Sequence, residues 1–392
     1  MKRLINPSQA SILVLGTNAG QADLIRYLKH KGFRVEACAH RSGGPGEAEC
    51  DAFHLVDIIN PDAVIKLAKE IEADLVYSIS SDVAMTTAVT VSEALDIPHY
   101  FNSSLVDLFN QKPMLRAFLN EHNLGHVDYV RASKLTDIAD WTTFPCMVKP
   151  SDSQGQRGVV RVNRIEELQD AATEALKASS VSGTAIVEEY LEGIEVSCNV
   201  LMRDGQVIFD VLSERLVHTG DLVGVPRGHL VPCLNITQEQ QVEALKLVHD
   251  ILAALGLQDG CLYFQMMITP KGPRIIEIAP RLDGCHMWHL IKHATGEDFL
   301  AATVSGLMET EDHTLPDTPP SPKGSFELMF QQAGAGEAFN KAAFPIPPDV
   351  LYHEYRYDDG QHIHAVNGKL EVVGYYIREL SPADIAKHRE TP

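Results

Sequence analysis

The sequence predicts a mixed α/β protein of several globular units, and three observations lead to this. Over the first hundred or so residues, apolar β-rich runs alternate with amphipathic helical stretches, the pattern of a parallel α/β unit. Further along, apolar strands follow one another closely, which predicts an antiparallel-rich body. The 392 residues, 45% of them hydrophobic, are enough to bury about two or three ordinary cores.

The first unit is expected to consist of alternating strands and helices. In chain order these elements are 11–15, 22–30, 33–37, 62–70 and 75–79. The turn after the first strand, GTNAG, leads into a helix as a dinucleotide-binding loop would. It lacks the three-glycine spacing of such loops, so a tight structural turn is the favoured interpretation.

The rest of the chain is expected to form a small unit, a larger body and a cap. A helical pattern at 105–122 leads to a second, smaller α/β unit that begins near Gly125. A Pro-rich segment at 315–323 indicates a boundary, and 324–380 alternates enough to form a small β-rich cap. The strands of the body are expected at 184–190, 196–202, 207–213, 261–268 and 274–278.

Composition restricts the partners. A net charge of -20 argues against nucleic acid, because a polyanion needs a basic face. No stretch is long and apolar enough to span a membrane, and the first apolar run is so short that it is interpreted as a buried strand and not a signal sequence. Seven scattered cysteines without CxxC spacing indicate reduced thiols and a cytoplasmic location. Small-molecule substrates are therefore expected.

The strongest local signal is FPCMVKPSDSQGQRGVV, at 144–160. A strand that ends near Lys149 leads into a polar loop around Gly155. Backbone N–H groups and the hydroxyls of Ser151 and Ser153 can surround phosphate oxygens, while Lys149 supplies a point charge. A solvated hairpin is the alternative interpretation.

A second segment, IVEEYLEGIEVSCNV at 186–200, carries acids within two partly apolar strands. The hinge at 188–191 can present backbone groups to an adenine edge, and Glu195 can accept hydrogen bonds from both ribose hydroxyls. Exposure on a strand edge is the alternative, and it is the favoured one for Glu189 and Glu192.

The third segment, CLYFQMMITPKGPRIIEIAPRLDG at 261–284, predicts a hairpin in which Gln265 and Glu277 occupy facing positions. Polar groups at core positions need partners, and a magnesium ion that carries ATP phosphates is one, because it prefers hard oxygen ligands. Arg281 can contact the reacting phosphoryl or acyl oxygen. For Arg281 the alternative is a structural salt bridge with Asp283 or Glu277.

Together these features form an ordered set that covers most of the chain: Lys112, Lys149, the glycine loop, Glu188 to Glu195, His218, Gln265, Glu277 and Arg281. This order resembles the ATP-grasp superfamily, in particular the synthetase units of carbamoyl-phosphate synthetase, biotin carboxylase and the L-amino-acid ligases. HTGD at 218–221 is similar to a loop of carbamoyl-phosphate synthetase.

The resemblance implies an ATP-grasp fold with a Rossmann-like N-terminal domain. It divides the chain into an N-terminal α/β domain (1–105), a helical linker (106–124), a lid subdomain (125–190), a catalytic subdomain (191–315) and a β-rich C-terminal subdomain (324–392).

The resemblance also implies a role for each site residue. The expected phosphate contacts are Lys112, Lys149, Ser153, Gly155, Gln156 and His218. The adenine hinge is Glu188, Tyr190 and Leu191, and Glu195 holds the ribose. Gln265 and Glu277 become the metal-side pair. Arg281 and Lys149 are the catalytic residues that stabilise the transferring group.

The implied activity is that of an ATP-dependent ligase that uses Mg²⁺ or Mn²⁺. It converts a carboxylate into an acyl phosphate, releases ADP and phosphate, and joins the acyl group to an amine, such as an amino acid. Arg227 and Arg281 are the expected contacts of a substrate carboxylate, because a guanidinium binds it through two parallel hydrogen bonds. A homodimer is a candidate assembly.

One departure from the family pattern keeps alternatives open. Ala279 stands where the Glu-x-Asn pattern of the superfamily would provide a further metal ligand. A bicarbonate-activating carboxylase or carbamoyl-phosphate-type enzyme is one alternative, and a catalytically degenerate ATP-binding regulatory protein is another. His286, His289 and His293 are spaced to share a helix face, and a polar face is favoured over a zinc cluster.

Overall fold

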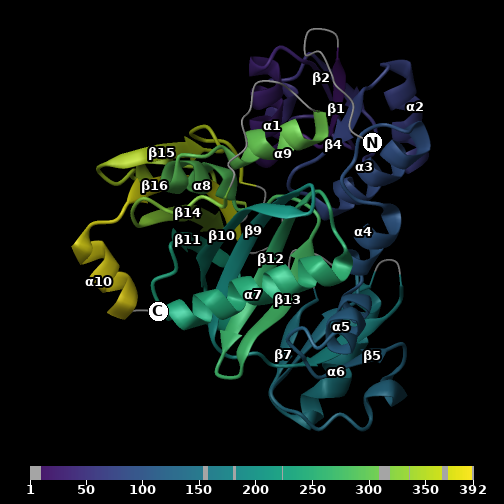
Figure 1. Cartoon of the computed structure of the whole chain (residues 1–392), viewed down its shortest axis with the longest axis vertical. Coiled ribbons are helices and arrows are strands. Elements are labelled where there is room, and N and C mark those ends of the chain that lie inside the picture. The colour runs from purple at the N-terminus through teal and green to yellow at the C-terminus, as the bar shows by residue number, and fades with distance from the viewer. Residues whose placement is uncertain are drawn as a thin grey trace.

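The computed structural model describes residues 10–152, 158–179, 182–222, 224–308, 318–334, 336–363 and 370–390. Their strands form three sheets, of four, eight and four strands. The N-terminal unit lies at the upper right of Figure 1, the small unit at the bottom, and the large sheet extends between them and to the left. This mixed architecture confirms the predicted α/β fold class. Among the described helices, none combines the length and hydropathy needed to cross a bilayer.

The N-terminal unit is a parallel sheet of strand order β3-β2-β1-β4. β1 is buried along its whole length, as expected of a parallel strand covered on both faces. The turn that follows is structural in form: Gly16 has a φ of +97°, and Asn18 caps α1 by accepting a hydrogen bond from the Gln21 amide at 3.1 Å. The elements are β1 (Ser11–Leu15), α1 (Ala19–His30), β2 (Arg34–Ala39), β3 (Ala52–Leu55), α2 (Pro61–Glu70), β4 (Leu75–Tyr77) and α3 (Asp82–Leu95).

Two helices, α4 (Ser103–Asn110) and α5 (Lys112–Glu121), lead to the small unit. Its sheet has the order β5-β8-β6-β7. The segment at 184–190, which the strand pattern put in the large body and the family resemblance put in the lid subdomain, forms β8 and pairs with β5 and β6 here. The elements are β5 (Tyr129–Ala132), β6 (Cys146–Pro150), β7 (Val160–Val162), α6 (Ile165–Ala178) and β8 (Ala185–Glu189).

The large sheet is antiparallel, with the order β13-β12-β9-β10-β11-β14-β16-β15. Along β9, Val196, Cys198 and Val200 are buried in the core that includes α7, so the alternate residues of this strand face the other side of the sheet. Its first elements are β9 (Ile194–Arg203), β10 (Gln206–Val217), β11 (Pro226–Val231), α7 (Gln238–Leu255), β12 (Gly260–Thr269) and β13 (Gly272–Ala279).

The C-terminal strands differ from the expected separate cap, because they continue the large sheet. β14 pairs with β11 from Gly228↔Met329 to Val231↔Phe326, which satisfies the backbone groups that β11 would otherwise leave open at an edge. The remaining elements are α8 (Met287–Thr295), α9 (Phe299–Met308), β14 (Phe326–Gly334), β15 (Val350–Tyr355), β16 (Leu370–Glu379) and α10 (Pro382–Glu390).

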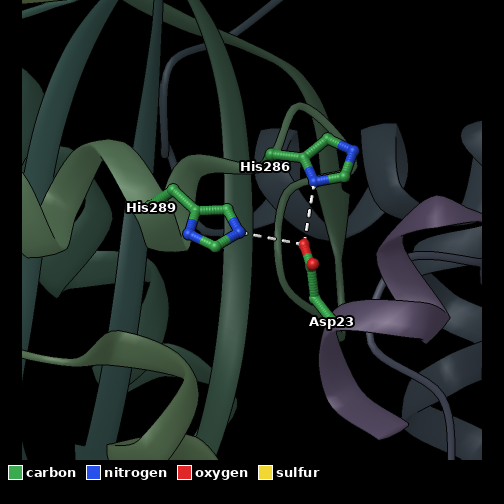
Figure 2. Close-up of side chains that lie close together, drawn as sticks. All are labelled: Asp23, His286 and His289. Atoms are coloured by element: carbon green, nitrogen blue, oxygen red, sulfur yellow. Dashed lines mark hydrogen bonds and ion pairs between the residues drawn. The ribbon is translucent and has the colours of Figure 1, made fainter. Parts of the chain in front are cut away.

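A buried carboxylate on α1 ties the N-terminal unit to the large one (Figure 2). Asp23 Oδ2 lies 3.1 Å from His286 Nδ1 and 3.0 Å from His289 Nε2, and it accepts a hydrogen bond from Trp288 Nε1 at 3.0 Å. Its other oxygen accepts one from Arg26 at 2.5 Å. Burial favours the neutral acid, but the hydrogen bonds from His286 and His289 outweigh it and hold the pKa of Asp23 well below its ordinary value.

The proton of the His286 ring can be assigned from its neighbours. Its Nε2 lies 2.5 Å from Arg356 Nη2, and a guanidinium can only donate, so Nε2 accepts and Nδ1 donates to Asp23. Burial lowers the pKa of His286, which keeps the ring neutral. Both ring nitrogens are thus engaged, and two guanidinium groups flank the cluster. Asp23, His286 and His289 therefore form a hydrogen-bonded connection between units, and a bound cation would be repelled there.

We expect Asp23→Asn to lower the free energy of unfolding by about 3 kcal/mol, because the amide would turn a donor toward buried donors and remove the carboxylate charge that Arg26 pairs with. Urea unfolding at neutral pH would measure the change. Asp140→Asn, at an exposed position, is the matched control and should change stability by less than about 0.5 kcal/mol. Equal effects of the two substitutions would contradict the assignment.

Candidate active site

Two cations from different elements converge on the carboxylate of Glu188 in β8. Glu188 is only 3% exposed. It accepts a hydrogen bond from Lys149 Nζ on β6 at 2.5 Å and one from Arg116 Nε on α5 at 2.5 Å. Burial raises the pKa of this carboxyl, but Arg116 and Lys149 outweigh burial and lower the pKa to about 2. The structure thus places two of the predicted site residues, Lys149 and Glu188, in direct contact.

A cavity opens where α5, the small unit and the large sheet meet. Lys112, the first residue of α5, lines it together with Glu188 and Glu277, so three predicted site residues from separate segments share one cavity. Burial lowers the pKa of Lys112, and the charge of Glu277 opposes that shift. The full lining is Asp82, Phe109, Asn110, Lys112, Leu115, Arg116, Glu188, Ile276, Glu277 and Ile278.

Gln265 and Glu277 lie directly opposite each other in the β12–β13 hairpin, the facing arrangement that the alternation of the two strands predicts. Burial raises the pKa of Glu277, and the nearby carboxylate of Asp82 adds to the shift, against the opposing charges of Arg281 and Lys112. A further cation beside Glu277 would favour its ionised form.

Glu195 lies with the hairpin residues on the large sheet. Its Oε1 accepts a hydrogen bond from Gln265 Nε2 at 2.5 Å and also an ion-paired one from Arg215 on β10. Two donors of the sheet thus already engage this carboxylate. The ribose contact expected of Glu195 gains no support from this position and stays a prediction.

Arg281 forms a bidentate salt bridge with Asp82, the first residue of α3 in the N-terminal unit. Its Nε and Nη2 donate to the two carboxylate oxygens at 2.5 and 2.9 Å. The sequence-based alternative, a salt bridge of Arg281 with Asp283 or Glu277, named the wrong partner, because Asp82 lies 199 positions away and no spacing rule connects the two. Burial disfavours the charge, but Asp82 outweighs it and raises the pKa of Arg281.

The expected adenine hinge follows the end of β8. Two of its backbone N–H groups are used within the protein: that of Glu189 donates to the Asp128 carbonyl at 3.0 Å and that of Tyr190 to the Pro145 carbonyl at 3.1 Å. The guanidinium of Arg161 lies 4.1 Å above the Tyr190 ring. Leu191 is half-buried and continues the hinge.

The remaining predicted residues lie away from this cavity or outside the described part of the chain. His218 Nε2 lies 2.8 Å from Gln332 Oε1, which ties the β10–β11 connection to β14. Arg227 is exposed on β11. The predicted phosphate contacts Ser153, Gly155 and Gln156 lie outside the described residues.

Two charged residues that line the cavity, Arg116 and Asp82, are not among the site residues predicted from the sequence. The sequence does contain a pattern that predicts Arg116 at the site. Arg116 follows Lys112 by four residues and therefore shares a face of α5 with it. Arg116 also donates to the Ile275 carbonyl of β13 at 2.6 Å. For Asp82 we find no local signal, because its partner is distant in sequence.

We expect Glu188→Gln to destabilise the protein by about 3 kcal/mol, because it leaves the buried charges of Arg116 and Lys149 uncompensated. The stability that Glu188 contributes depends on pH. The pKa of about 2 lies below the ordinary value of 4.5, so this stability is complete above pH 4.5 and is lost as the pH falls toward 2. Urea unfolding at several pH values would measure it. Glu192→Gln, at an exposed position, should leave the pH profile unchanged.

Parts of the chain resemble known proteins in sequence. A family model described as an ATP-grasp domain matches residues 142–288. The ATP-grasp enzyme fsqD of Aspergillus fumigatus is 28% identical over 233 residues, which cover 48% of this chain and 39% of that protein. The formate-dependent phosphoribosylglycinamide formyltransferase of Corynebacterium jeikeium is 25% identical over 194 residues, covering 48% of this chain and 47% of that protein.

The matched regions therefore span less than half the length of these two relatives. Among solved structures, an L-amino acid ligase from Bacillus licheniformis superposes with a TM-score of 0.80 at 16% identity, covering 98% of this chain and 97% of that one. At this identity the likeness establishes the fold alone. Residues 142–288 thus resemble an ATP-grasp domain, and the chain as a whole shares the fold of the L-amino acid ligase structure.

Proposed function

We propose that the protein is an ATP-dependent ligase that activates a carboxylate as an acyl phosphate and joins it to an amine, such as an amino acid. The observation that carries the proposal is the group of charged residues around a small cavity between the small unit and the large sheet. There Lys112, Glu188 with its partner Lys149, and Glu277 meet. ATP phosphates carry several negative charges, and Lys112 and Lys149 offer positive ones at the same place.

The hairpin residues fit a magnesium ion, with Mn²⁺ as a substitute. Glu277 offers a partly buried carboxylate whose pKa is raised by burial and by the nearby carboxylate of Asp82. The amide nitrogen of Gln265 donates to Glu195, so its oxygen is the atom suited to a metal. When bound, Mg²⁺ would neutralise phosphate charge. Ala279 offers no ligand, so the phosphates and water would complete the coordination.

The protein's own residues would act mainly by position and charge. Lys112, Lys149 and Arg281 would offset charge on the phosphoryl oxygens while a substrate carboxylate attacks the γ-phosphate. Lys149 and Arg281 are paired with Glu188 and Asp82, which hold each side chain in place. The attack of the substrate carboxylate would break the bond between the γ-phosphorus and ADP, which leaves. The amine would then attack the acyl carbon and lose a proton, forming the C–N bond as phosphate leaves. The small unit would act as a lid that excludes water from the acyl phosphate.

Two other functions have specific support. The HTGD segment at 218–221 favours bicarbonate as the activated acid. Ala279, buried opposite Tyr263 in the hairpin register, favours a nucleotide-binding protein without catalysis, because it cannot ligate a metal. The experiments that follow separate these functions from the ligase.

We expect phosphate release in a screen of carboxylic acids and amino acids to require ATP and a pair of substrates, with ADP as the nucleotide product. Glu277→Ala should reduce substrate-dependent ADP release at least about 100-fold, because Glu277 is the charged residue expected to hold the metal. Glu192→Ala, at an exposed position, is the control.

The other outcomes each identify a rival. AMP and pyrophosphate as products would exclude an acyl-phosphate mechanism. Bicarbonate-dependent turnover without any amine would favour the carboxylase. ATP binding in calorimetry with no turnover over the whole panel would favour the regulatory protein.

We expect Arg227→Ala to raise the KM of the substrate acid about tenfold and to leave the KM of ATP nearly unchanged, since a guanidinium binds a carboxylate through two parallel hydrogen bonds. Arg131→Ala, another exposed arginine, is the matched control. Steady-state kinetics with either substrate varied would measure both constants. An equal rise in both KM values would argue against a substrate role for Arg227.

A further inference from the structure

A row of polar residues crosses the face of the large sheet that bears Gln265. Glu277 lies opposite Gln265, Gln265 opposite Ser197, and Ser197 opposite Ser213, across β13, β12, β9 and β10. Because side chains alternate along a strand, all four point to the same face. Ser213 Oγ lies 2.9 Å from Ser197 Oγ and 3.2 Å from His229 Nδ1 on β11, which extends the row by one strand.

His229 ends this row with an unpartnered nitrogen. The residue is 0% exposed. Its Nδ1 is engaged by Ser213, whereas its Nε2 has no hydrogen-bond partner among the described residues. Burial lowers the pKa of His229 to about 4, against the opposing charge of Asp283, so the ring is neutral at physiological pH. A neutral ring whose second nitrogen is buried and open is suited to a ligand.

The loop after β13 places an unpartnered carboxylate oxygen beside His229. A nitrogen of His229, a carboxylate oxygen of Asp283 and Cys285 Sγ all lie within 4.8 Å of one another. Asp283 is 3% exposed, and its Oδ1 accepts a hydrogen bond from the Cys285 backbone at 3.0 Å. Its Oδ2 has no partner among the residues that the structure describes. An orphaned buried carboxylate oxygen calls for a donor, and a charged donor most of all.

Two neighbouring residues on the same sheet face favour a polar molecule over a metal ion as the ligand of His229 and Asp283. Arg215, directly opposite His229, has an unpartnered Nε, and Asn199, opposite Tyr263, has both amide atoms unpartnered within the described part of the chain. N–H groups cannot ligate a metal, and the charge of Arg215 also opposes one. A single partner that donates hydrogen bonds to Asp283 and offers an acceptor to Arg215 or Asn199 would satisfy these atoms together. An amine that carries an oxygen close to its nitrogen, as an α-amino acid does, meets both needs.

We propose that His229, Asp283, Asn199 and Arg215 form the binding site for the amine substrate, with the ammonium group on Asp283 Oδ2 and His229 Nε2. This assignment rests on the proposed ligase function. Asp283 follows Arg281 by two residues, and the guanidinium of Arg281 lies 5.9 Å from the ring centre of Tyr263 on the same sheet face. The amine site therefore lies next to the residue expected to stabilise the acyl phosphate, as the transfer of an acyl group requires.

The test compares two nucleophiles on one acyl phosphate. Hydroxylamine attacks an acyl phosphate, forms a hydroxamate and releases phosphate; it is small and uncharged at neutral pH, so it has little need of the Asp283 charge. We expect Asp283→Asn to raise the KM of the amino acid found in the screen about 30-fold, the loss typical of a charged hydrogen bond. Hydroxamate formation should fall at least about tenfold less than amino-acid ligation.

Two further variants test whether a change in the ratio of the two activities arises from the amine site and not from unfolding. His229→Gln should change the ratio of the two activities in the same direction, and Asp140→Asn, at an exposed position, should leave the ratio unchanged. Thermal unfolding of each variant would show that it is folded.

Four results would overturn the assignment, and they are distinguishable. Equal losses with both nucleophiles, or no loss with either, would exclude the amine site while the ligase function stands. Absence of hydroxamate from the natural protein with every acid tested would exclude the ligase function itself, and the amine site with it. Addition of Co²⁺ alone, giving a thiolate-to-cobalt absorption band that Cys285→Ser abolishes, would identify the group as a metal site.

Discussion

The buried carboxylate of Glu188 is the point on which the candidate site depends. Lys149 holds it from within the small unit, and Arg116 holds it from the linking helix α5. Because Arg116 also donates to the Ile275 carbonyl of β13, one guanidinium connects the small unit to the large sheet. An ionised carboxylate that is 3% exposed is tolerated only with both partners in place. The cavity that contains Lys112 and Glu277 lies at this junction.

On the N-terminal side, too, buried acids from one unit bind hydrogen-bond donors of another. Asp82 of α3 holds Arg281, and Asp23 of α1 holds the start of α8. Both acids are supplied by the parallel α/β unit, which carries none of the residues assigned to the nucleotide. Its contribution to the site is therefore to orient groups of the large sheet. An arginine fixed at both carboxylate oxygens loses little freedom when it meets a phosphoryl group.

Sequence patterns predicted those parts of the molecule that depend on local order. The alternation of β12 and β13 placed Gln265 opposite Glu277, and the strand–helix alternation gave the α/β class. Local sequence patterns could not predict contacts between segments that are far apart in the chain. The pairing of Arg281 with Asp82 spans 199 positions, and the pairing of β11 with β14 joined an expected cap to the large sheet. The acids of 186–200 had the right composition for a site, but only the folded structure separates Glu188, at the cavity, from Glu195, on the sheet.

The positively charged side chains of the site are held in ion pairs with buried acids, and this arrangement affects how an anion can bind. The protein has a net charge of -20, so phosphates approach a molecule that repels them overall. Lys149 and Arg281 are each neutralised by a buried acid, and Lys112 lies near Glu277. A nucleotide would compete with Glu188 and Asp82 for these cations instead of meeting free charges. The affinity for the nucleotide would then depend on whether Lys149 and Arg281 can contact a phosphate while they stay paired with Glu188 and Asp82. Phosphate binding would thus depend on the ion pairs at the junction of the small unit, α5 and the large sheet. Local ion pairing, more than net charge, thus decides where an anion can bind.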